Sequence, residues 1–168
     1  MKNRIVKILI FILFVSPAVL KAEIDNPRIA NENAVKNAEI FLTLEVFDAS
    51  SSTGIFNIWI NPESQSINAS GITLNYGTSS IVMLATMTGN SYCDFFLENS
   101  FDNSLGILSL SGMKPYPGIA TTSLMGQIFF EKIDEATSTI SISQKDSMIL
   151  ANNGYATNIL ATSTGLKL

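Results

Sequence analysis

Apolar and polar residues alternate along most of the chain from residue 38 onward, and Gly, Asn, Ser and Pro interrupt the alternation at short intervals. In the segment 54–61, for example, Phe56, Ile58 and Ile60 occupy every second position. A period of two places successive side chains on opposite faces of a β-strand. Each such segment is therefore expected to bury one face in a core and to leave the other in water.

Nine segments carry this alternation, and no segment shows the sustained 3.6-residue period of a helix. The predicted strands are residues 39–47, 54–61, 66–76, 80–87, 91–98, 105–112, 122–130, 137–143 and 155–163. Side chains expected in the core include Leu74, Leu108, Ile128 and Ile140. Many short strands with one apolar face each predict an all-β sandwich.

The first residues follow a different pattern. Three basic side chains precede an uninterrupted apolar run at 8–15, and small residues then offer cleavage points after Ala18 or Ala22. This is the order of a secretory signal peptide, and the run is shorter than the roughly 20 residues that a spanning helix needs. Residues 1–22 are predicted to be a signal peptide, with an uncleaved N-terminal anchor as the alternative.

Three parts of the chain follow from this interpretation. After the signal peptide, the polar, asparagine-rich residues 23–37 are expected to be a flexible lead. Residues 38–168 are expected to fold as one domain. The product is predicted to be secreted or held at the cell surface, with no membrane span once the signal is cleaved.

Composition and charge exclude some partners. Apolar residues make up 46% of the chain and charged residues 14%, which is typical of a folded domain rather than a disordered tail. Loss of residues 1–22 removes four of the 10 basic side chains and none of the 14 acidic ones, so the net charge changes from −4 to about −8. Such a surface repels phosphate backbones, so nucleic-acid binding is not expected.

Several stretches, in their order and spacing, resemble the cohesin domain family. They are "SINASGITLNY" at 66–76, "SFDNSLGILSLSG" at 100–112, "MGQIFF" at 125–130 and "SMILANNGYATNIL" at 147–160. The resemblance implies a nine-stranded jelly-roll sandwich without catalytic activity. It also implies a dockerin-like protein module as the partner, while related sandwich modules bind polysaccharide.

The cohesin resemblance further implies that one outer sheet, built from the third, fifth, sixth and eighth strands, does the binding. Its outward side chains here would be Thr73, Asn75, Ile107, Ser109, Thr139 and Ser141. After the third strand the family usually has Tyr-Asp-Pro, whereas this chain has Tyr76-Gly77-Thr78. Gly71 stands near a position that is acidic in classical dockerin-binding cohesins.

The sequence offers little catalytic or metal-binding chemistry. It contains no histidine, which is the commonest general base and a common metal ligand. The adjacent acids Asp134 and Glu135 are expected in a solvated turn. The stretch 102–104, Asp-Asn-Ser, is typical of a turn, with a calcium site as the alternative. No catalytic residue, cofactor or metal site is therefore predicted.

Two single residues have alternative interpretations. Cys93 is the only cysteine, so an intrachain disulfide is not expected, and it is interpreted as a half-buried apolar residue in a strand rather than a reactive thiol. Trp59 is predicted to point away from Phe56, Ile58 and Ile60. It is expected either to pack under a loop or the lead, or to stack on a sugar ring or a partner side chain.

The leading hypothesis is an exported, non-catalytic recognition module that binds a dockerin-like module or another surface protein through an outer sheet. The alternatives are a polysaccharide-binding module of the same architecture, and a structural surface or adhesin subunit. Aligned planar aromatics would favour the polysaccharide alternative, and the sequence shows no obvious row of them.

Overall fold

The computed structural model describes residues 35–168, which form eleven β-strands and no helix. The predicted signal peptide, residues 1–22, and residues 23–34 of the predicted lead lie outside the described residues. Within residues 35–168 there is no helix long and apolar enough to cross a membrane.

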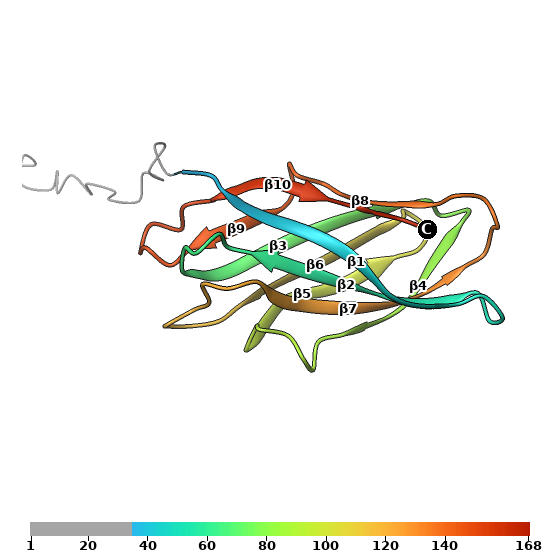
Figure 1. The fold of residues 1–168 in the computed structure, drawn as a ribbon, viewed down its shortest axis with the longest axis horizontal. Helices are drawn as coiled ribbons and strands as arrows, with labels where there is room; N and C mark the ends of the chain where they lie inside the picture. The colour runs from blue at the N-terminus through green and yellow to red at the C-terminus, as the bar shows by residue number, and fades with distance from the viewer. Residues whose placement is uncertain (1–34) are drawn as a thin grey trace, which may run out of the picture.

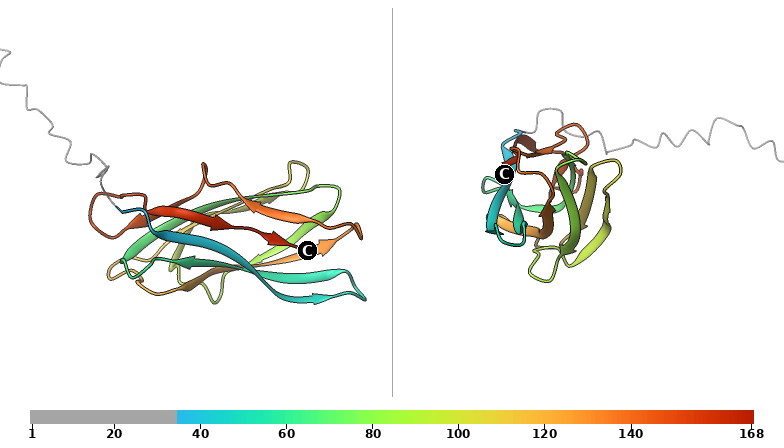
Figure 2. Two further views of the ribbon diagram at one scale, coloured as in Figure 1. Left: turned by 45° about the horizontal axis from the view of Figure 1, so that its top comes forward. Right: turned by 90° about the vertical axis from the view of Figure 1, so that its right-hand side faces the viewer.

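The strands form two sheets that face one another as two layers (Figures 1 and 2). The β1 sheet has the order β10–β1–β2–β7–β4 and consists of β1 (Ala38–Asp48), β2 (Thr53–Asn61), β4 (Ile81–Met87), β7 (Ser123–Lys132) and β10 (Leu160–Thr164). The β3 sheet has the order β11–β8–β3–β6–β5, with β9 also paired to β3. It consists of β3 (Ile67–Tyr76), β5 (Phe95–Asp102), β6 (Ile107–Met113), β8 (Thr139–Ile142), β9 (Met148–Ala151) and β11 (Leu166–Lys167). The predicted all-β sandwich is confirmed.

The core lies between the two sheets and consists of the apolar halves of the alternating strands. Leu74, Leu108, Ile128 and Ile140 are each at most 1% exposed, as the alternation predicted. Phe56 and Phe130 are the largest fully buried side chains, and their ring centroids lie 5.8 Å apart. Burial of one such side chain contributes about 1.5–3 kcal/mol, so the interior dominates the stability of a domain without disulfides.

The fifth strand was predicted four residues too early. The prediction was residues 91–98, whereas β5 runs over Phe95–Asp102 and the preceding residues form an irregular segment. A β-bulge between Phe96 and Glu98 leaves Leu97 without a partner on β6 and shifts the alternation by one position. Two short strands, β9 and β11, were not predicted at all.

Asn103 ties the two sheets together at the turn between β5 and β6. Its Oδ1 accepts hydrogen bonds from the Tyr76 hydroxyl of β3 and from the backbone N–H of Met83 in β4, both at 2.8 Å. Its Nδ2 donates to the Met83 carbonyl oxygen at 2.9 Å. The amide therefore pairs with Met83 as a neighbouring strand would, at a point where β4 has no partner strand on that side.

Gly106 closes the same turn in a conformation that requires glycine. Its φ is +66°, and a Cβ at this position would lie 2.2 Å from the Tyr76 carbonyl oxygen. The Tyr76 N–H in turn donates to the Gly106 carbonyl at 2.9 Å. The close approach of the turn to β3 is what brings Asn103 within reach of β4.

We predict that Asn103→Ala lowers the free energy of unfolding by about 2–3 kcal/mol, because it removes three hydrogen bonds that each contribute about 0.5–1.5 kcal/mol. Urea denaturation monitored by circular dichroism measures this change. Asn99→Ala is the matched control, since Asn99 is exposed and no side-chain hydrogen bond joins it to the described residues. Equal effects of the two substitutions would show that Asn103 does not tie the sheets.

Stability is also expected to fall at alkaline pH. Desolvation, with a smaller effect of the Asp102 charge, raises the pKa of Tyr76 to about 12. The folded state therefore favours the neutral phenol, and this contribution is complete below about pH 10 and is lost as the pH rises through about 12. Unfolding measured at a series of pH values should show the decline, and Tyr76→Phe should make it shallower.

Burial also raises the pKa of Tyr92. Part of the alkaline decline in stability should therefore remain in the Tyr76→Phe variant. Tyr116→Phe is the control, because Tyr116 is 91% exposed. If Tyr116→Phe flattens the pH profile as much as Tyr76→Phe does, the cause assigned to Tyr76 is wrong.

Candidate binding faces

The six side chains predicted to form a binding face all point outward from the β3 sheet. Cross-strand pairing places Thr73 opposite Ser109, and Asn75 opposite both Ile107 and Ser141. The sixth residue, Thr139, is on β8, where it pairs with Lys167 of β11 and is exposed. The structure therefore brings these residues together on one surface, and their role in binding stays a prediction.

Not all of these polar groups are available to a partner. The hydroxyl of Thr73 donates to the Asp146 carbonyl at 3.4 Å, and its backbone N–H donates to Ser147 Oγ at 3.1 Å. The connection between β8 and β9 thus occupies Thr73. Asn75 and Ser109 make no side-chain hydrogen bond within the described chain, so they are better placed to bind an incoming group.

An apolar cluster that the sequence analysis missed lies at the other end of the same face. Phe95 of β5, Met113 of β6 and Leu150 of β9 point outward in one cross-strand row, with Ala69 of β3 between the last two. Met148 follows in the next row and lies against Gly71, where a Cβ would contact its side chain at 3.6 Å. Phe95 and Met148 are 58% and 43% exposed. We call Phe95, Met113, Met148 and Leu150 the apolar end of the β3 sheet.

Acidic side chains border this face along the edge strand β5. Glu98 lies opposite Ser111, and Asp102 lies opposite Ile107. Asp94, just before β5, forms an exposed ion pair with Lys114 at 3.1 Å. The edge that a partner would approach is therefore mainly negative.

The outer face of the β1 sheet carries Trp59. The ring points away from the core, as predicted, and is half-buried among its neighbours on the sheet surface. Trp59 pairs with Phe41 of β1 and with Leu124 of β7, and the Phe41 and Trp59 rings lie 6.4 Å apart with planes 17° from parallel. The indole N–H donates to Thr43 Oγ1 at 2.9 Å, which holds the ring in place.

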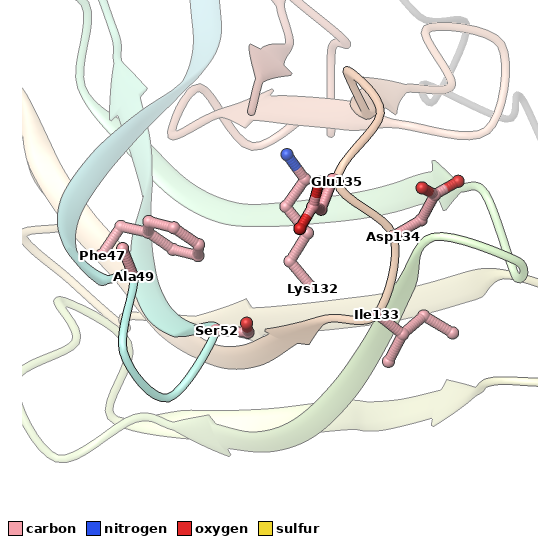
Figure 3. Close-up of a pocket in the computed structure, with 7 residues that line it drawn as sticks. All are labelled: Phe47, Ala49, Ser52, Lys132, Ile133, Asp134 and Glu135. Carbon is pink, nitrogen blue, oxygen red and sulfur yellow. The ribbon is translucent and has the colours of Figure 1, made fainter.

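A cavity of about 480 Å³ opens at one end of the β1 sheet, between the β1–β2 hairpin and the end of β7 (Figure 3). Phe47 lines one side, and the carboxylates of Asp134 and Glu135 point in different directions. Asp134 Oδ1 accepts a hydrogen bond from the Ala136 N–H at 3.0 Å, as in a polar turn. The geometry matches the predicted turn and does not bring two carboxylates together for acid–base catalysis.

The Asp102–Ser104 stretch also behaves as a turn. Asp102 Oδ1 accepts hydrogen bonds from the Ser104 N–H and hydroxyl and from the Leu105 N–H, at 2.8, 2.6 and 3.2 Å. These bonds lower the pKa of Asp102 and direct its Oδ1 into the turn. Among residues 35–168, no three His, Cys, Asp or Glu side chains are grouped closely enough to hold a metal ion.

Cys93 is more deeply buried than predicted and lies outside the strands. It is 9% exposed, and burial raises the pKa of its thiol. The sulfur lies close to Gly112, where a Cβ would meet it at 2.8 Å. A thiol that burial keeps protonated packs as a small apolar residue, because nucleophilic attack requires the thiolate.

No family model and no curated protein matches the chain. Solved structures do match its fold. The third cohesin of ScaC, in complex with the ScaB dockerin from Acetivibrio cellulolyticus, is 15% identical, with a TM-score of 0.64 over 78% of this chain and 96% of that one. A cohesin in a type I cohesin–dockerin complex from Clostridium thermocellum is 14% identical, with a TM-score of 0.62 over 81% and 94%.

A cohesin described as non-cellulosomal also matches the fold. This cohesin, from the archaeon Archaeoglobus fulgidus, is 8% identical, with a TM-score of 0.61 over 78% of this chain and 88% of that one. These matches span nearly the whole of each solved domain. The chain therefore has a cohesin-like fold.

Proposed function

We propose that the protein is a non-catalytic recognition module that binds a dockerin-like protein module through the outer face of the β3 sheet. The observation that carries the proposal is the cohesin-like fold, because several of the similar solved structures are cohesins in complex with dockerins. The features of the face itself support the same function. If the partner is another surface protein instead of a dockerin-like module, the proposed binding face is the same and only the identity of the partner changes.

The apolar end supplies the central contact in this proposal. Protein interfaces depend on a few buried apolar or aromatic side chains, surrounded by polar groups that exclude water. Phe95 is the largest exposed side chain of the cluster and lies directly beside Met113. The hydroxyl and amide groups of Ser109 and Asn75 then form the polar rim.

The acidic edge would select the charge of the partner. Glu98 and Asp102 point outward on the same face as Phe95 and lie on its own strand. Complementary charge raises association rates and suppresses wrong partners. A dockerin-like module with basic side chains next to its apolar contact is therefore the expected partner.

Export is part of the proposal. The basic and apolar order of residues 1–22 is typical of a secretory signal peptide, which would place the domain outside the cytoplasm. Detection of a mature chain that begins after Ala18 or Ala22, by N-terminal sequencing of the secreted product, would support this location.

We predict that Phe95→Asp weakens binding by about 2 kcal/mol or more, because a charge replaces the central apolar contact. This corresponds to a roughly thirtyfold rise in Kd. Isothermal titration calorimetry against a panel of purified dockerin modules, including the ScaB dockerin, measures the change.

Thr162→Arg is the control for Phe95→Asp, since Thr162 is exposed on β10 of the opposite sheet. Its Kd should equal that of the unaltered chain. The proposed function fails if none of the dockerin modules binds, or if Phe95→Asp binds as tightly as Thr162→Arg.

We further predict that Ile107→Asp and Ser109→Arg weaken dockerin binding less than Phe95→Asp does, because these positions form the rim. Each variant should stay within about 0.5 kcal/mol of the unaltered stability, as is usual for surface substitutions. Calorimetry and urea denaturation on the same preparations test both statements. Unfolding of either variant would show that these positions do not face water.

A further inference from the structure

The outer face of the β1 sheet carries an aromatic row between two polar rows. Pairing across the strands aligns Thr164, Phe41, Trp59 and Leu124 in one row. On one side, the next outward row contains Thr43, Asn57 and Gln127. On the other side, Thr162, Glu39 and Asn61 lie in register. Beyond Thr43, Asn57 and Gln127, a second outward apolar row contains Val46, Ile55 and Phe129. The aromatic pair itself therefore has hydrogen-bonding groups on both sides, and we call its row the stripe and the two polar rows the margins.

The aromatic pair at the centre of the stripe is held in a fixed arrangement. The Trp59 and Phe41 planes are 17° from parallel, and the bond from Trp59 Nε1 to Thr43 Oγ1 restrains the indole. That bond satisfies the single donor of the indole, so the ring needs no further polar partner. Two restrained, nearly parallel rings lose little conformational entropy when a flat ligand stacks on them.

The margins are suited to hydroxyl groups. Gln127 donates to Asn57 Oδ1 at 3.0 Å and also to Glu45, and Thr164 donates to Glu39 at 3.1 Å. Asn57 is only 9% exposed and supports Gln127 from below, so the oxygens that can accept bonds from a ligand are those of Gln127, Glu39 and Glu45. A sugar ring presents apolar C–H groups on its face and hydroxyl donors around its edge, which matches this combination of stripe and margins.

The charge of the face disfavours an anionic ligand. Glu39 and Glu45 border the stripe, whereas Lys132 is the only basic residue in the five strands of this sheet and lies at the cavity end. Carboxylates accept bonds from hydroxyl donors but repel uronic acids, phosphates and sulfates. An apolar protein surface would also leave the two polar margins desolvated without partners.

We propose that this face binds a neutral polysaccharide, which stacks on Trp59 and Phe41 and donates hydroxyl hydrogen bonds to the polar margins. The site lies on the opposite sheet from the proposed dockerin face and does not depend on it. The protein could then attach to a glycan by one sheet and to a protein module by the other.

Affinity electrophoresis of the purified chain in native gels tests the proposal. The gels contain hydroxyethyl cellulose, mixed-linkage β-glucan, xylan or glucomannan, and polygalacturonate serves as the anionic comparison. We expect at least one neutral polysaccharide to retard the chain and polygalacturonate to leave it unretarded. Trp59→Ala should raise the apparent Kd for that polysaccharide about tenfold, as expected for loss of one ring-stacking contact.

Three further measurements make the result decisive. Phe41→Ala is the second stacking variant and should also bind less tightly, which keeps the test valid if Trp59→Ala does not fold. Phe95→Ala, on the opposite sheet, should bind polysaccharide as the unaltered chain does. Trp59→Ala should in turn keep the dockerin affinity of the unaltered chain. Failure of one proposal can therefore be distinguished from failure of the other.

The proposal is overturned if no neutral polysaccharide retards the chain, if polygalacturonate retards it equally, or if folded stacking variants migrate as the unaltered chain does. Sedimentation of the chain alone tests a second copy as the occupant of the face. A dimer that Trp59→Ala dissociates would assign the face to that contact instead of a glycan.

Discussion

The structure depends on one constraint, which is that a strand exposes one side whenever it buries the other. Each sheet covers the core with its inward residues, so both outward faces remain available for other roles. Inward positions such as Leu74 and Ile128 have no exposure, and they leave little freedom for change. Any difference in function between the two sheets therefore depends on the residues at their outward positions.

The two outer faces differ in how their apolar residues are arranged. On the β3 sheet most of these residues gather at one end, around Phe95 and Met113, while Ile107 lies at the other end among small polar groups and beside the acidic edge. On the β1 sheet they lie in rows across the strands, and the row through Trp59 and Phe41 has polar groups on both sides. A localised cluster suits the centre of a protein interface, whereas a stripe with polar margins suits a linear amphipathic ligand.

The sequence predicted most strands because alternation is a local property. It placed Leu108 and Ile140 inside and Ser109 and Ser141 outside, as the structure has them. It could not place β5, because a bulge at Leu97 interrupts the period of two. It also missed β9, whose four residues are too few to show a clear period.

Neither face was predicted in full, because each requires the register between distant strands. The apolar end joins Phe95, Met113 and Leu150, and only the pairing of β5, β6, β3 and β9 brings them together. Phe41 and Trp59 likewise become neighbours through the β1–β2 register. The sequence therefore showed Trp59 as a single outward ring, with no sign of the second ring beside it.

The separation of the two faces has a consequence for any dual role. Sheets packed face to face lie about 10 Å apart, and the outward side chains on opposite faces are further apart than this. Substitutions more than about 7–10 Å apart without shared partners have nearly additive effects. Trp59 and Phe95 share no contact and are separated by a close-packed core, so a ligand on one face changes affinity on the other only if it rearranges that core. The two-layer architecture therefore predicts that binding free energies at the two faces are additive. A cohesin-like module could then bind two different partners at once, with neither partner changing the affinity for the other.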